Sequence, residues 1–256
     1  MKIVTCIKQV PDSEAKVTAQ NGQVNWGDSP LVINPFDEYA VEAALQQKEA
    51  LGAEVTVLCI GPDTAKDAIK HALAMGADNG ILVTDPAIGE IDSQGAARIL
   101  AAAIKKIGDA DMVIFGRQTI DTASGVTPAQ TARLLGWPLL SFVDKIEVAA
   151  PAIKVERTIE EGKQAVSAKL PAVLSIIQGI GEPRYPSFMG IRKASKAVIP
   201  EWPLADLGLA APAAVVTRAE LLNPPTRDTE CEIIAGETPE AIAEALVEKI
   251  IAEKVL

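Results

Sequence analysis

The stretch GRQTIDTASGVTPAQ, residues 116–130, has the residue types and spacing of a phosphate-binding loop. A short apolar run ends at Gly116, the small residues TASG follow, and Thr127-Pro128 has the form of a helix start. With Thr127 as N-cap, the N–H groups of residues 124–127 lie at the positive end of a helix dipole, where anions bind. The alternative is an ordinary capped loop, because small residues are common in such turns.

Other chemistry finds little support in the residue pattern. GIG at 179–181 is not followed by a helical pattern, and the chain has no P-loop motif. His71, the single histidine, lies within a helical pattern, which favours a partly buried packing role over acid–base catalysis. The three cysteines are far apart in sequence, which indicates reduced structural thiols rather than a disulfide framework or zinc site. We therefore predict neither a catalytic residue nor a metal site.

The elements that must position this loop follow from the apolar pattern. KIVTCI (2–7), EVTVLCI (54–60), GILVT (80–84) and DMVIFG (111–116) are typical of strands buried on both faces. Alanine-rich stretches with apolar residues at three- and four-residue spacing lie between them. This alternation predicts βαβ units, hence an α/β fold with a doubly wound, mostly parallel sheet.

The pattern changes after GWP at 136–138. Four strand-like runs joined by polar turns follow up to residue 177, which predicts a β-rich extension of the sheet or a small hairpin layer. We expect one α/β domain over 1–199 and a C-terminal arm plus helix over 200–256, because residues 200–235 are rich in proline and alanine without a sustained period. Thr238 is the expected N-cap of the closing helix.

Composition narrows the function classes. The 256 residues carry a formal net charge of −10. This argues against a general nucleic-acid binder, because a negatively charged protein repels the phosphate groups of nucleic acid. The sequence has neither a signal-peptide core nor a membrane-spanning run, so we predict a cytoplasmic protein without direct membrane insertion. The one concentrated basic patch is GIGEPRYPSFMGIRKASKAVI, residues 179–199, which also displays Phe188 and Ile191.

Several motifs resemble one family. NPFDEYAVEAAL, ALAMGAD, GRQTID followed by LLGWP, VERTIEEGKQAVSAKLPAVLS and EPRYPSFMGIRKASK occur in the order and at about the spacing of the electron transfer flavoprotein β subunit. The resemblance covers nearly the whole chain, and it implies a doubly wound fold of the Rossmann-like or adenine-nucleotide α-hydrolase-like type. It implies an electron carrier subunit rather than an enzyme, in a heterodimer with an α subunit that holds most of the FAD. It also implies AMP in the β subunit, or a second FAD in the electron-bifurcating branch.

The resemblance implies two sets of site residues. The nucleotide pocket would comprise Cys6, Asn34, Pro35, Phe36, Asp37, Ile60, Gly116, Arg117, Gln118, Asp121, Thr122, Ala123, Ser124, Gly125, Val126 and Thr127, with Phe36 also near the α-bound flavin. The segment after EPRY would be a recognition loop for flavin dehydrogenases, comprising Arg184, Tyr185, Phe188, Ile191, Arg192, Lys193 and Lys196. Phe188 would be its apolar anchor, and the alternative is that Phe188 folds back onto its own core.

The chain also departs from the family pattern. Where many AMP-binding members have Asn-Gln-Thr before the helix, this chain has Gly125-Val126-Thr127, and Pro128 replaces a glycine. Glu161 stands where Gly or Asp is usual. The bifurcating-type loop is not reproduced either, so both branches stay open. A quinone oxidoreductase or similar acceptor is the further partner that the resemblance implies. The alternative function is a free-standing adenine-nucleotide-binding α/β module with a regulatory role.

Overall fold

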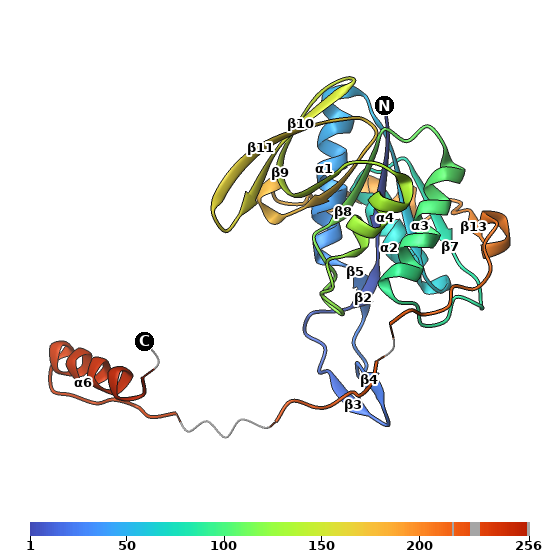
Figure 1. Ribbon diagram of the computed structural model, residues 1–256. Helices are drawn as coiled ribbons and strands as arrows, with labels where there is room; N and C mark the ends of the chain where they lie inside the picture. Colours follow the sequence, from blue (N-terminus) through green and yellow to red (C-terminus); the bar gives the residue numbers. More distant parts are fainter. Residues whose placement is uncertain (217, 226–230, 255–256) are drawn as a thin grey trace. The chain divides into compact units, whose positions relative to one another are not determined.

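One nine-stranded sheet organises the chain (Figure 1). The computed structural model describes residues 1–216, 218–225 and 231–254. The strand order is β11-β10-β9-β12-β8-β1-β6-β7-β13, and all neighbours from β9 to β13 run parallel. The central strands are β12 (Ala172–Ile176), β8 (Met112–Gly116), β1 (Lys2–Ile7), β6 (Glu54–Ile60) and β7 (Asn79–Val83). The four apolar runs of the first half are therefore parallel strands, as the alternation predicts.

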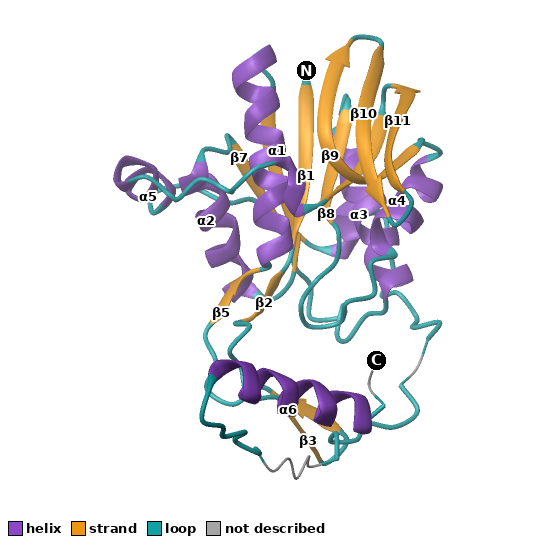
Figure 2. Cartoon of the chain, turned by 90° about the vertical axis from the view of Figure 1, so that its left-hand side faces the viewer, coloured by secondary structure: helices purple, strands orange, loops and turns teal. Residues whose placement is uncertain are grey.

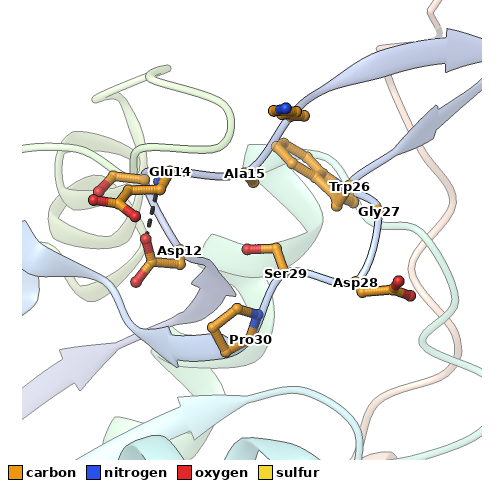
Figure 3. Close-up of a pocket in the computed structure, with 10 residues that line it drawn as sticks. Asp12, Glu14, Ala15, Trp26, Gly27, Asp28, Ser29 and Pro30 are labelled. Carbon is orange, nitrogen blue, oxygen red and sulfur yellow. Dashed lines mark hydrogen bonds between the residues drawn. The ribbon is translucent and has the colours of Figure 1, made fainter.

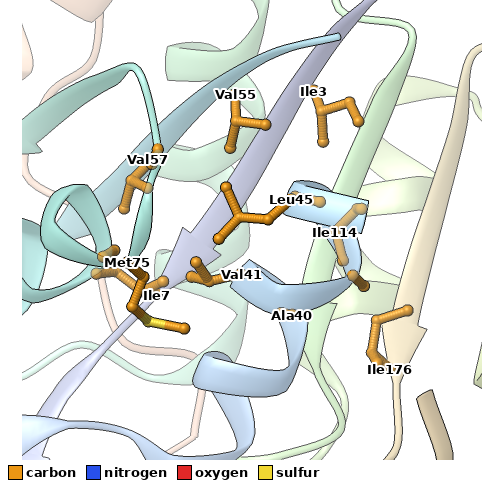
Figure 4. Close-up of a cluster of buried hydrophobic side chains, with 14 of the residues drawn as sticks. Ile3, Ile7, Ala40, Val41, Leu45, Val55, Val57, Met75, Ile114 and Ile176 are labelled. Atoms are coloured by element: carbon orange, nitrogen blue, oxygen red, sulfur yellow. The ribbon is translucent and has the colours of Figure 1, made fainter. Parts of the chain in front are cut away.

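Helices cover both faces of this sheet, and Figure 2 shows α1 and α2 on one side with α3 and α4 on the other. Their bounds are α1 (Pro35–Leu51), α2 (Lys66–Met75, after the 3-10 turn η1, Asp63–Ala65), α3 (Ser93–Ile107) and α4 (Thr127–Leu135). An apolar core lies on each face of the sheet. Alternate residues of each strand pack into one core or the other, because successive side chains point to opposite faces. The first core, drawn in Figure 4, includes Ile3, Leu45, Val57 and Ile114. The second includes Val4, Leu58, Ile99 and Val113.

The β-rich region extends the same sheet rather than forming a separate layer. Its strands are β9 (Leu139–Ala149), β10 (Ala152–Ile159) and β11 (Gly162–Lys169), which pair antiparallel in chain order. β12 then returns to the centre, between β9 and β8. One face of this extension carries Ile153 and Val155 into the first core, which fits the alternating pattern of IKVERTI. Of the two expectations for this region, the sheet extension is correct.

An insertion between β1 and α1 had no counterpart among the expected elements. It contains two small antiparallel pairs, β2 (Gln9–Pro11) with β5 (Leu31–Ile33) and β3 (Thr18–Gln20) with β4 (Gln23–Asn25). A hollow of about 710 Å³ lies in this insertion (Figure 3), with walls that include Asp12, Trp26 and Asp28. These strands are three residues long, too short for periodicity to reveal them.

The C-terminal boundary differs from the expected residue 199. The chain forms two compact units, Met1–Leu221 and Leu222–Leu256. In the first unit, β13 (Glu201–Trp202) pairs with β7 and the 3-10 turn η3 (Leu204–Leu207) buries Leu204 in the second core. The first part of the expected arm is thus an edge strand of the sheet. The second unit contains α6 (Pro239–Ala252), capped by the Thr238 hydroxyl as predicted.

Three further expectations concern local structure. Val126, not Thr127, is the N-cap of α4, because the Val126 carbonyl already accepts the N–H of Gln130 and Thr127 is helical. The three cysteines are free thiols. Among the described helices, none has both the length and the apolar content needed to cross a bilayer.

Candidate functional site at the switch point of the sheet

The direction of the chain reverses between β1 and β8. From β1 the chain proceeds to β6 and β7, with α1 and α2 on one face, whereas from β8 it proceeds through α4 toward β9 and β12 on the other side. Ligands of doubly wound sheets bind beyond the carboxyl ends of the strands at such a reversal. The segments that meet there are residues 8–12, the start of α1 and the loop 117–126.

Asp37 joins these segments at the switch point. Its side chain is buried, and Oδ2 accepts the N–H of Lys8 at 2.8 Å. The N–H of Gly116 also bonds to this carboxyl group. A Cβ on Gly116 would lie 2.5 Å from Asp37 Oδ1 and 2.6 Å from the carbonyl carbon and oxygen of Phe36. The start of α1 can therefore approach the end of β8 only where that strand ends in glycine.

Asn34 ties the start of α1 to the loop after β8. Its Nδ2 donates to the carbonyl of Gln118 at 2.9 Å, and its Oδ1 accepts the N–H of Ile120 at 3.1 Å. The N–H of Asn34 donates to the carbonyl of Lys8 at 2.9 Å. Asn34 makes no side-chain cap to its own helix, although it occupies the N-cap position. Both ends of its amide are used by the loops, so Asn34 positions the site rather than offering a free group to a ligand.

Burial dominates the electrostatics at the switch point. It raises the pKa of Asp37 to about 7, against the opposing effect of the hydrogen bonds from Asn34, Lys8 and Gly116. Burial also raises the pKa of the Cys6 thiol, and the neighbouring Asp37 carboxyl adds to that effect. Cys6 is therefore a neutral packing residue at the end of β1 rather than a reactive thiolate.

Lys8 links Asp37 to the loop after β8 and lies on the solvent side of both. Its ammonium group forms an ion pair with Asp121, whose side chain is 13% exposed, while that of Lys8 is 42% exposed. Burial acts to raise the pKa of Asp121, but hydrogen bonds from Lys8 and Thr119 outweigh it and hold the pKa below its usual value. Lys8 was not among the expected site residues. Its position immediately after a strand that ends at the switch point is the signal that could have identified it.

The loop before α4 is open to solvent. Residues 122–126 are exposed. The loop contains a turn, in which the N–H of Ala123 donates to the carbonyl of Thr119 at 2.9 Å. Ala123 and Gly125 have φ of +50° and +62°. The N–H groups of residues 124–127 have no hydrogen-bond partner in the parts of the chain that the structure describes. Unpaired donors at the start of a nine-residue helix form a surface suited to an anion.

The expected nucleotide residues separate between the two faces of the sheet. Cys6 and Ile60 belong to the second core, on the side of α3 and α4, which is also the side of the loop before α4. The segment from Asn34 to Asp37 starts α1 on the opposite face. Cys6, Ile60 and the open loop can thus share one ligand, while Asn34 and Asp37 support them through the backbone bonds described above.

Arg117 and Phe36 lie in a neighbouring groove of about 600 Å³. The guanidinium of Arg117 is 5.7 Å from the ring centroid of Phe142, and that of Arg157 is 6.0 Å from the same centroid. Phe142 has φ of +59°, a conformation that phenylalanine rarely adopts. The other walls come from residues 158–161 and 177–179. No pattern in the sequence could have identified Phe142, because its strained backbone depends on the irregular pairing of β9 with β10 and β12.

The basic segment 179–199 contains a short helix, α5 (Phe188–Ala194), capped by the Ser187 hydroxyl. The helix rests on the end of α2, because a Cβ on Gly190 would lie 2.2 Å from the carbonyl oxygen of Ala74. The side chains of Tyr185, Phe188 and Ile191 are 95%, 83% and 53% exposed. Phe188 therefore does not fold back onto its own core.

The cations of this segment have different surroundings. Arg184 Nε donates to Glu42 at 2.8 Å, and the guanidinium also pairs with Glu49, both on α1. Arg184 thus anchors the segment and is not a free charge. Arg192, Lys193 and Lys196 are exposed and form no ion pair within the described residues. The free positive charge beside Phe188 comes from these three residues.

His71 is partly buried, as its place in a helical pattern predicts. Its Nε2 is 2.8 Å from Glu38 Oε1, and its side chain is 35% exposed. Within the described residues, no group of three or more His, Cys, Asp or Glu side chains could hold a metal ion.

The doubly wound sheet with an open loop at its switch point is the architecture of the Rossmann-like α/β proteins. A family model described as the electron transfer flavoprotein domain matches residues 27–207. The chain belongs to the electron transfer flavoprotein family, as one of its β-type subunits.

Curated relatives agree with this assignment. The chain is 35% identical over 257 residues to the caffeyl-CoA reductase-Etf complex subunit CarD of Acetobacterium woodii, covering 98% of both chains. It is 32% identical to the electron transfer flavoprotein subunit beta of Megasphaera elsdenii, over the full length of both. It is 36% identical to the protein FixA of Azorhizobium caulinodans, covering 82% of this chain and 77% of the relative.

Proposed function

We propose that this chain is the β subunit of a heterodimeric electron transfer flavoprotein, which scaffolds the FAD held mainly by an α subunit. At its switch point it binds AMP, or a second FAD. The main support for a nucleotide site is that the N–H groups of residues 124–127, at the start of α4, are unpaired within the described residues. Such groups bind the phosphate of a nucleotide. Cys6 and Ile60 supply an apolar floor on the same side of the sheet for a purine ring.

Helix α6 carries an apolar face that its own compact unit does not cover. Within that unit none of its residues is buried, and Leu246, Val247 and Ile251 are 46%, 52% and 62% exposed. Large exposed apolar patches mark interaction sites, and we propose the α subunit as the occupant of this one.

Released nucleotides test the proposal directly. The chain is co-expressed with the α subunit, purified, denatured and analysed for nucleotides. A yellow heterodimer that releases one FAD and one AMP, or two FAD, is the expected result. A chain that remains monomeric beside the α subunit and binds nucleotide without it would favour the regulatory module instead.

Gly125→Asp is expected to weaken nucleotide retention by about tenfold or more, because it places a carboxylate beside the phosphate. Gly125→Asn is the matched control. Both side chains tolerate the positive φ of +62° at this position and have nearly the same shape, but only aspartate is negatively charged. Nucleotide stoichiometry after extensive dialysis is the measurement. Equal retention by the Asp and Asn variants would place the phosphate elsewhere.

The segment 179–199 is proposed to dock flavin dehydrogenases, with Phe188 as the anchor. Exposed aromatic side chains surrounded by free cations are typical of contacts with an acidic partner surface. Phe188→Ala should weaken dehydrogenase binding by about 2 kcal/mol or more, with stability and bound FAD unchanged because the ring is 83% exposed. Binding is measured by titration of the dehydrogenase.

Val198→Ala serves as the control for this docking experiment, since Val198 is 92% exposed in the same segment but outside α5. Its substitution should leave the affinity unchanged. Equal affinities for wild type and Phe188→Ala would show that Phe188 is not the anchor.

A further inference from the structure

The chain from residue 200 to residue 216, here called the strap, is fastened to the α/β unit. β13 joins the sheet beside β7, and the ammonium of Lys106 lies 4.4 Å from the ring centroid of Trp202. The N–H of Leu204 donates to Asp85 Oδ2 at 3.1 Å. After η3 the chain passes beneath α3 in the view of Figure 1 and reaches the start of that helix. The strap is therefore attached at both its beginning and its end.

Residues 215 and 216, the last two of the strap, are attached by a single carboxylate. Asp92 caps α3, because its Oδ1 accepts the N–H of Gly95 at 2.7 Å. Its Oδ2 accepts two more N–H groups, from Val215 at 2.7 Å and from Val216 at 2.9 Å. Pro212 packs on the same helix start, 3.4 Å from the place of a Cβ on Gly95. The two oxygens of Asp92 thus have separate partners, the helix and the strap.

Hydrogen bonds, not packing, hold the last residues of the strap. The side chains of Val215 and Val216 are 63% and 70% exposed, so they gain little from burial. Hydrogen bonds to an ionised acceptor are stronger than neutral ones. The three backbone N–H groups, that of Gly95 first, hold the pKa of Asp92 below its usual value. The carboxylate is therefore ionised and able to accept all three bonds at neutral pH.

We propose that Asp92 fixes the point at which the C-terminal arm leaves the α/β unit. With the bond to Val216 in place, the strap is held at the start of α3 as far as residue 216. Without it, the next contact back along the strap is that of Pro212 with the start of α3. Residues 213–216 would then lengthen the reach of α6 by up to about 14 Å. A longer tether lowers the effective concentration of α6 for a partner, a consequence that rests on the proposed function.

Asp92→Asn separates the two tasks of this side chain. Asparagine keeps one oxygen, which can cap α3, but its amide nitrogen donates and cannot accept from Val215 and Val216. Amide hydrogen exchange of the full chain is the measurement. The N–H groups of residues 215 and 216 should exchange about tenfold faster or more in the variant, with the Gly95 amide unchanged. Asp85→Asn is the matched control, since Asp85 accepts from Leu204 farther back on the strap.

Trypsin gives a second readout, because Arg218 is two residues beyond the anchor and a protease binds its substrate as an extended segment. Faster cleavage after Arg218 in Asp92→Asn, but not in Asp85→Asn, is expected. Unprotected amides at 215 and 216 in the wild type, or equal exchange in the wild type and Asp92→Asn, would overturn the proposal. Neither measurement needs the α subunit or a nucleotide, so failure here is distinct from failure of the proposed function.

Discussion

Gly116→Ala is expected to destabilise the protein by about 3 kcal/mol or more and to abolish nucleotide retention. The added methyl would lie 2.5 Å from Asp37 Oδ1 and 2.6 Å from the Phe36 carbonyl. Neither neighbour is the free end of a flexible side chain, since Asp37 is held by the N–H of Lys8 and Phe36 contributes main-chain atoms. Relief of the overlap must therefore separate α1 from β8, which displaces the loop before α4. Urea unfolding and nucleotide stoichiometry measure the two effects.

Gly52→Ala is the control for this experiment. Gly52 ends α1 with φ of +66°, and nothing lies within 4 Å of the place of its Cβ. The substitution costs about 1–2 kcal/mol of backbone strain far from the switch point, and it should leave nucleotide retention intact. If Gly116→Ala unfolds at the wild-type urea concentration and retains nucleotide, the start of α1 is not the rigid neighbour described here.

Asp37 is expected to make the free energy of unfolding fall as pH rises from about 4 to about 7. The pKa of Asp37 is about 7 in the folded protein, whereas an unfolded aspartate has a pKa of about 3.9. Between these values the folded state holds a proton that the unfolded state has released. The unfolded state binds fewer protons, so stability declines by at most about 1.4 kcal/mol per pH unit. Above the folded pKa both states are ionised and this contribution no longer changes.

Asp37→Asn should remove that slope, because the amide is neutral at every pH. The measurement is the difference in urea unfolding free energy between wild type and variant from pH 5 to pH 8, in which the other titrating groups cancel. The stability of the variant should rise relative to wild type as pH increases. Asp28→Asn makes the same chemical change at an exposed position and should leave the slope unchanged. Parallel profiles for wild type and Asp37→Asn would contradict burial as the cause.

The two substitutions test different aspects of one packing arrangement. Gly116→Ala tests the distance between α1 and β8, and Asp37→Asn tests the charge buried between them. If neither substitution changes the free energy of unfolding, α1 and β8 are packed less closely at the switch point than the structure shows. The Gly125 pair then reports on the loop alone, because a Cβ at Gly125 meets its nearest neighbour, the Arg117 carbonyl, at 3.4 Å.

The sequence by itself determined the succession of the central strands and helices along the chain. Apolar spacing shows directly whether a segment is a buried strand or an amphipathic helix. It also located the loop before α4, since small residues followed by Thr127-Pro128 encode a helix start in consecutive residues. The Thr238 cap of α6 has the same local origin. These features depend on neighbours in the chain, and a single sequence contains that information.

Only the tertiary structure decided which polar groups remain available for a ligand or a partner. Asn34 and Asp37 look like ligand residues in sequence, but their side chains bond to the backbone of residues 8, 116, 118 and 120. Arg184 looks like a free cation but pairs with Glu42, 142 residues away. Asp92 looks like a simple helix cap but also holds Val216, 124 residues away. Such partners are chosen by the packing of the sheet and its helices, which brings distant residues together, and no local pattern encodes that choice.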